Sequence, residues 1–71
     1  MAPSEPDGRG PESAIPIRGV AEEYAWIARN LPGAQFLRQA LITSEDGPFD
    51  VLTLALESGE EREVYFDISS F

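Results

Sequence analysis

The side chains in this sequence that could do chemistry are carboxylates, hydroxyls and guanidinium groups, because it contains no histidine, cysteine or lysine. The usual general base near neutral pH, the thiolate and amine nucleophiles, and the imidazole and thiolate ligands of zinc are therefore missing. A pair of carboxyl groups can act as acid and base only where a cleft gives them different environments. A domain with one helix offers little room for such a cleft, so we expect neither an enzyme nor a cofactor.

Metal and phosphate sites are not expected either. Glu45, Asp46 and Asp50 surround one loop, but the segment lacks the alternating acids, central glycine and terminal glutamate of a calcium-binding loop. We interpret it as a solvated turn. Gly8 and Gly10 do not form a phosphate-binding loop, because no predicted strand precedes them and no helix follows directly.

Charge is the strongest signal in the composition, with 13 acidic residues against 5 basic ones and a net charge of −8. The basic residues are all arginines, spread singly along the chain, which disfavours binding to nucleic acid or anionic lipid. Two interpretations of the acidity remain open: solubility of a small domain, or attraction of a basic partner. No apolar run approaches the length of a membrane span, and the first residues do not resemble a signal peptide, so we expect a cytoplasmic protein outside the membrane. Arginine without lysine is typical of GC-rich bacterial genomes.

The chain is expected to comprise a disordered arm over residues 1–14 and one small domain over residues 15–71. The arm is rich in proline, glycine and acids. Ile15-Pro16-Ile17 is a candidate for a short edge strand at the start of the domain. A helix is predicted from Val20 to Leu31, where Val20, Tyr24, Ile27 and Leu31 form a stripe expected to face a sheet, before Pro32-Gly33 ends the helix.

Residues 34–43 decide the architecture, because their pattern fits either a strand or a second helix. Two strands follow them, over residues 49–57 and 61–69. We favour a strand, since a third strand gives a sheet enough width to be stable. The predicted fold class is therefore α+β, with one helix packed on a three-stranded antiparallel meander. The alternative is two helices and a β-hairpin.

Two features predict a surface for binding another protein. Trp26 projects away from the apolar stripe of the helix, and tryptophan is enriched where binding energy concentrates, although it also commonly lies over a sheet edge. One face of the sheet should combine an apolar strip with acids. The predicted interface consists of Trp26, Val51, Thr53, Ala55, Glu63, Tyr65 and Asp67. We expect a small acidic module that binds another protein, for example as an accessory or regulatory subunit, and the acidity suggests that its partner is basic. The alternative is a self-associating, homodimeric structural domain. An enzyme is the least favoured class.

Overall fold

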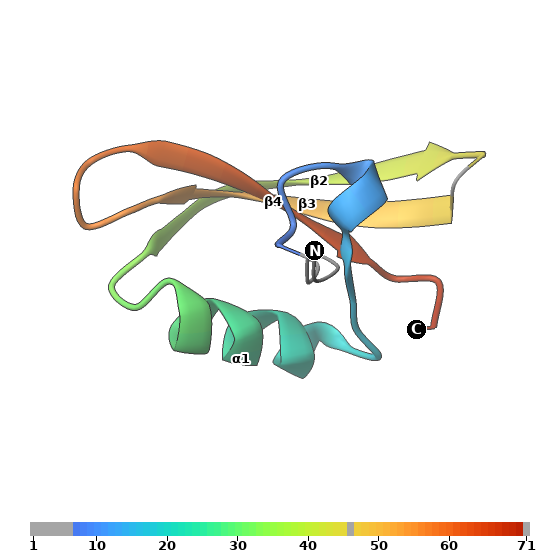
Figure 1. Ribbon diagram of the computed structural model, residues 1–71, viewed down its shortest axis with the longest axis horizontal. Coiled ribbons are helices and arrows are strands. Elements are labelled where there is room, and N and C mark those ends of the chain that lie inside the picture. The colour runs from blue at the N-terminus through green and yellow to red at the C-terminus, as the bar shows by residue number, and fades with distance from the viewer. Residues whose placement is uncertain (1–6, 46, 71) are drawn as a thin grey trace, which may run out of the picture.

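The computed structural model describes residues 7–45 and 47–70, which form one helix and a four-stranded mixed sheet (Figure 1). Helix α1 lies below the sheet and runs along only part of its length. The elements in chain order are η1 (Pro11–Ser13, a 3-10 turn), β1 (Ile15–Pro16), α1 (Val20–Asn30), β2 (Gln35–Ser44), β3 (Gly47–Ala55) and β4 (Glu61–Asp67).

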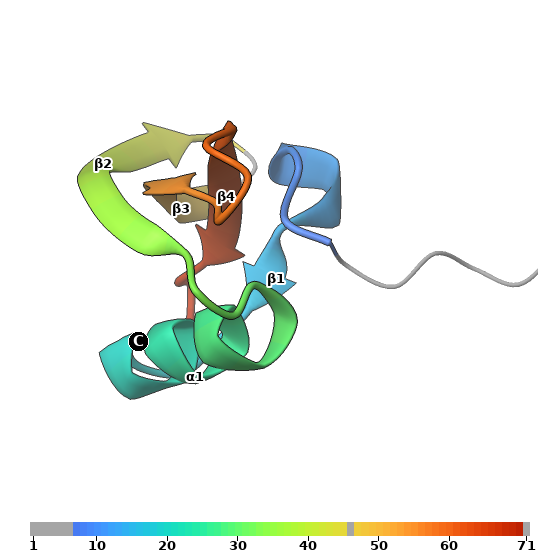
Figure 2. The ribbon, with the colours of Figure 1, turned by 90° about the vertical axis from the view of Figure 1, so that its left-hand side faces the viewer.

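The sheet has the strand order β1-β4-β3-β2. Strands β2, β3 and β4 form the predicted antiparallel meander, so the segment over residues 34–43 is a strand and the alternative with two helices is wrong. The edge strand β1 adds a fourth member parallel to β4, with Ile15 opposite Phe66. Figure 2 shows β1 and β2 on opposite sides of the sheet, with α1 below it. Strand β2 is therefore the other edge.

Residues 7–14, expected to belong to a disordered arm, lie along β4. The amide of Tyr65 donates to the carbonyl of Gly8 over 2.7 Å, and the amide of Gly8 donates to the carbonyl of Ser13 over 2.9 Å. Gly8 has a positive φ of 75°, and a Cβ atom there would lie 2.7 Å from Val64 Cγ1. Glycine is the residue that meets both demands. Residues 1–6 of the expected arm lie outside the described residues.

The core lies between α1 and the inner face of the sheet. Its buried members come from β1 and the segment after it, from β3 and from β4: Ile15, Ile17, Leu52, Leu54, Val64 and Phe66. Trp26 and Ile27 of α1, and Leu31 directly after the helix, pack against this cluster. None of the described helices is long and apolar enough to cross a bilayer.

The helix is rotated relative to the predicted stripe. Val20 and Tyr24 were expected to face the sheet but are 53% and 55% exposed, whereas Glu23 is only 2% exposed. The aromatic ring of Trp26 contacts that of Phe66 edge to face, with the ring centres 5.8 Å apart. We attribute the rotation to the indole, since burying it against the core places Glu23 over the sheet and turns Val20 and Tyr24 outward.

Candidate functional site

The six predicted interface residues of the sheet share its outer face, the face turned away from α1. In the β3–β4 register, Val51 lies opposite Tyr65 and Thr53 lies opposite Glu63. Val51 and Thr53 are nonetheless only 3% and 5% exposed, so the apolar strip between the acids is covered within the chain. Among the predicted interface residues of the sheet, only Glu63 is exposed; Ala55, Tyr65 and Asp67 are half-buried.

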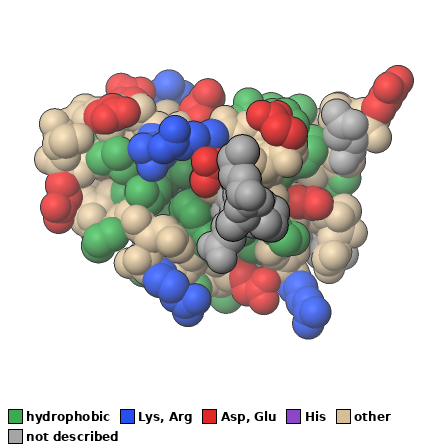
Figure 3. All heavy atoms as spheres, viewed as in Figure 1, with side chains coloured by type: hydrophobic (Ala, Val, Ile, Leu, Met, Phe, Trp, Pro, Cys, Tyr) green, Lys and Arg blue, Asp and Glu red, His purple; other side chains and the backbone are tan. Residues whose placement is uncertain are grey.

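Two half-buried members of this face are engaged in contacts of their own. The ring of Tyr65 packs edge to face against Phe49, with the ring centres 6.4 Å apart. The carboxylate of Asp67 accepts a hydrogen bond of 2.9 Å from the amide of Ser69, which lowers the pKa of Asp67. Figure 3 shows acidic side chains scattered over the visible face of the molecule, without a single acidic patch. The outer face therefore offers little free apolar surface.

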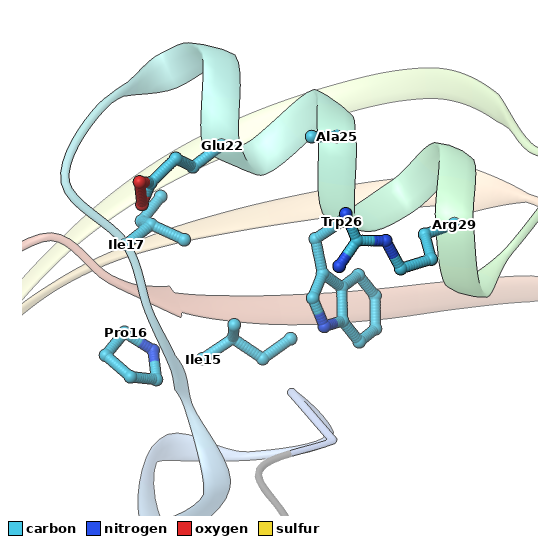
Figure 4. Close-up of a pocket in the computed structure, with 7 residues that line it drawn as sticks. All are labelled: Ile15, Pro16, Ile17, Glu22, Ala25, Trp26 and Arg29. Carbon is cyan, nitrogen blue, oxygen red and sulfur yellow. The ribbon is translucent and has the colours of Figure 1, made fainter.

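Trp26, the predicted interface residue of the helix, lies beside β1. It is half-buried and lines a shallow hollow of about 290 Å³ between α1 and β1, together with Ile15, Ile17 and Arg29 (Figure 4). Its indole points from the helix toward Ile15. The indole therefore lies next to the edge strand β1.

The helix covers a buried pair of acids, Glu23 of α1 and Asp50 of β3, which the sequence analysis did not single out. Burial raises the pKa of Glu23 to about 8, and the neighbouring Asp50 carboxyl group adds to the shift as a hydrogen-bond partner and a like charge. Gln39 of β2 donates to Asp50 Oδ1 over 2.7 Å. Glu23 Oε2 has no hydrogen-bond partner among the described residues. A neutral Glu23 can instead donate a hydrogen bond to the neighbouring Asp50 carboxyl group.

This carboxyl pair is poorly placed for catalysis. A general acid with a pKa near neutral suits acid–base chemistry, but Glu23 and Asp50 are 2% and 4% exposed. The hollow beside α1 is lined by Glu22 and not by Glu23. Among residues 7–45 and 47–70, no three histidine, cysteine or acidic side chains gather into a metal-binding group, and Asp46 of the turn considered above lies outside those ranges.

The largest free apolar surface on the sheet is β2. All ten of its residues are exposed. Four of them are large and apolar: Phe36 is 49% exposed, Leu37 43%, Leu41 68% and Ile42 37%. In the part of the chain that the structure describes, no strand pairs with the outer edge of β2. A long, apolar, unpaired edge of this kind is a template for pairing with another chain.

The register identifies the backbone groups at this free edge. The carbonyl of Pro48 accepts from the amide of Ile68 over 3.2 Å, so Pro48 faces the β4 side of β3. Because backbone groups alternate in direction along a strand, Phe49 faces β2 and bonds with Ile42, its partner in the register. The neighbours of Ile42, Leu41 and Thr43, then direct their amides and carbonyls outward, and so does Gln39.

The charge distribution sets the same region apart. Residues 24–44 contain two arginines and no acid, whereas the other residues hold all thirteen acids. This acid-free segment includes α1 from Tyr24 onward and the whole of β2. The signal was visible in the sequence, but only the strand order shows that it coincides with an open edge. No family model, curated protein or solved structure matches the chain.

Proposed function

We propose that this chain is a protein-interaction module that binds another polypeptide by adding a strand to the free edge of β2. The single observation that carries the proposal is the exposure of all ten residues of β2, including four large apolar side chains, at an edge with no neighbour among the described residues. Added strands gain affinity from backbone hydrogen bonds and specificity from alternate side chains.

The choice of β2 replaces the outer face as the docking surface. Val51 and Thr53, predicted to contact a partner there, are buried, whereas Leu41 is the most exposed large apolar residue of β2. A binding role is supported over catalysis because the carboxyl pair with a perturbed pKa is enclosed beneath α1.

Capture of proteins on immobilised chain tests the proposal. We compare wild type with Leu41→Lys, which places a charge on the edge, and with Ser58→Lys, which adds the same charge in the exposed turn between β3 and β4. A protein retained by wild type and Ser58→Lys but lost by Leu41→Lys is expected. A bound second copy of the chain counts as a captured protein. Equal retention by all three chains would contradict docking on β2.

A further inference from the structure

The side of α1 nearest to β2 is open. The hollow between α1 and β1 is lined by Glu22, Trp26 and Arg29, which places that flank of the helix toward β1. At 100° per residue, Val20 and Tyr24 lie on the opposite flank. Since β1 and β2 are the two edges of the sheet, this flank faces the β2 side. Val20 and Tyr24 are exposed on this flank. They belong to the apolar stripe of the helix, and the sheet does not cover this part of the stripe.

The apolar side chains of β2 on the inner face lie on that same side. Leu41 is opposite Asp50, and Phe36 is opposite Leu54. Leu54 packs in the core beneath α1, and Asp50 lies beside Glu23 of the helix, so both face α1. Residues directly opposite one another share a face. Phe36 and Leu41 therefore border the open flank of the helix, and together they form an incomplete apolar layer.

We propose that the occupant of this edge is a second copy of the chain, paired antiparallel through β2 about a two-fold axis. The two four-stranded sheets then merge into one of eight strands. This inference rests on the proposed function and names its partner. A two-fold axis perpendicular to the sheet puts both helices on one side, where their open flanks close over Phe36 and Leu41 of both copies.

The backbone at the edge suits this pairing. Gln39, Leu41 and Thr43 direct their hydrogen-bonding groups outward, and antiparallel pairs exchange such groups reciprocally. The register centred on Ala40 pairs Gln39 of each copy with the partner's Leu41. A β-bulge at Leu37 interrupts β2, so the regular pairing in this register covers the segment from Arg38 to Ile42 of each copy. This register places the small side chains of the two Ala40 residues at the two-fold axis, where the Cα atoms of a non-hydrogen-bonded pair come within about 4.5 Å of each other.

Charge favours a second copy over a basic partner. A basic protein would be attracted to acids, and apart from Val20 the surface to be covered lies in the segment over residues 24–44, which has none. Two such faces meet without the repulsion that the net charge of −8 would cause elsewhere on the surface. Arg38 does not oppose the contact, because it reaches across the outer face to Glu61, with the charged atoms 3.6 Å apart.

Sedimentation velocity across a dilution series tests the dimer, with wild type, Leu41→Lys and Ser58→Lys compared. We expect wild type and Ser58→Lys to form dimers with the same dissociation constant. Leu41→Lys should weaken the dimer about 100-fold, about tenfold for each copy, because each buries one lysine at the interface. Leu41 is 68% exposed in the single chain, so unchanged thermal unfolding of the variant at low concentration serves as the check on folding.

A chain that stays monomeric up to millimolar concentration would overturn the dimer. Docking on β2 would then still be judged by the capture experiment, since that experiment accepts any bound protein. A wild-type dimer that Leu41→Lys leaves intact would overturn the dimer interface proposed here.

A cysteine at position 40 tests the register. The chain has no cysteine of its own, so Ala40→Cys can form only one disulfide, between two copies. In the proposed register the two Ala40 residues form a non-hydrogen-bonded pair, with Cα atoms about 4.5 Å apart, which a disulfide can bridge. We expect rapid covalent dimers from Ala40→Cys and slow ones from Glu60→Cys, a control in the exposed β3–β4 turn. Equal rates would overturn the register.

Discussion

Replacing Glu23 by glutamine should stabilise the fold at alkaline pH. The Glu23 carboxyl group is 2% exposed, and burial beside Asp50 raises its pKa from 4.5 to about 8. Between these two values the folded chain keeps a proton that the unfolded chain releases. The free energy of unfolding of the wild type therefore falls as the pH rises from below 4.5 toward 8, and the stabilisation is fully present only in acid.

The size of the effect follows from this shift in pKa. Each pH unit between the two pKa values removes about 1.4 kcal/mol from the free energy of unfolding. From pH 5 to pH 8 the loss amounts to about 4 kcal/mol, as an upper bound for a group next to another carboxyl group. Glutamine keeps the shape of the side chain and can donate a hydrogen bond to Asp50, but it has no proton to lose. The variant should exceed the wild type by about 2–4 kcal/mol at pH 8 and differ little from it at pH 5.

Urea denaturation at half-unit steps from pH 5 to pH 8.5 measures this difference. Glu60→Gln is the matched control, because it removes one carboxylate from an exposed turn and should keep the pH dependence of the wild type. If Glu23→Gln retains the wild-type slope, the buried carboxyl group is not the origin of the pH dependence and the reasoning is refuted.

Two further substitutions test the packing. Trp26→Ala should cost about 3 kcal/mol in thermal unfolding, since the indole packs on Phe66; an unchanged melting temperature would mean that Trp26 is free on the surface. Gly8→Ala should destabilise more than Gly59→Ala, because both glycines have positive φ but only at Gly8 would a Cβ atom meet Val64. Equal unfolding temperatures would show that residues 7–14 do not pack on β4.

Much of the fold could be predicted from local patterns. Alternation at Val64, Phe66 and Ile68 identified β4, and the apolar run through Leu52 and Leu54 identified β3. The helix was placed within one residue of its end at Asn30. These elements were predictable because the spacing of apolar side chains and the turn residues that bound each element are both visible within a few neighbouring positions of the sequence.

The orientation of the helix was not predictable in the same way. A stripe of apolar residues predicts which side of the helix faces the sheet. The large Trp26 side chain, which packs on Phe66, turns the helix so that the sheet contacts one side of that stripe. The burial of Glu23 could not be foreseen, since its neighbour Asp50 comes from β3 and the partner of Asp50, Gln39, comes from β2. Helix packing and strand register together bring the three side chains to one place.

The candidate site depended on strand order, which the local pattern does not determine. The meander of β2, β3 and β4 has two possible edges for a further strand. Because β1 pairs with β4, the edge of β2 stays open. The absence of acids from residues 24–44 could be read from the sequence, but it supports the proposed interface only once β2 is known to be an exposed edge.

Amide hydrogen exchange, followed residue by residue in dilute and concentrated samples, tests the docking edge most directly. The amides of Leu41 and Thr43 face outward, so they should exchange fast in dilute solution and become protected as the concentration rises. The amide of Ile42 faces β3 and should be protected in both samples. Exchange at Leu41 and Thr43 that is fast at every concentration would contradict pairing of β2 with a second copy.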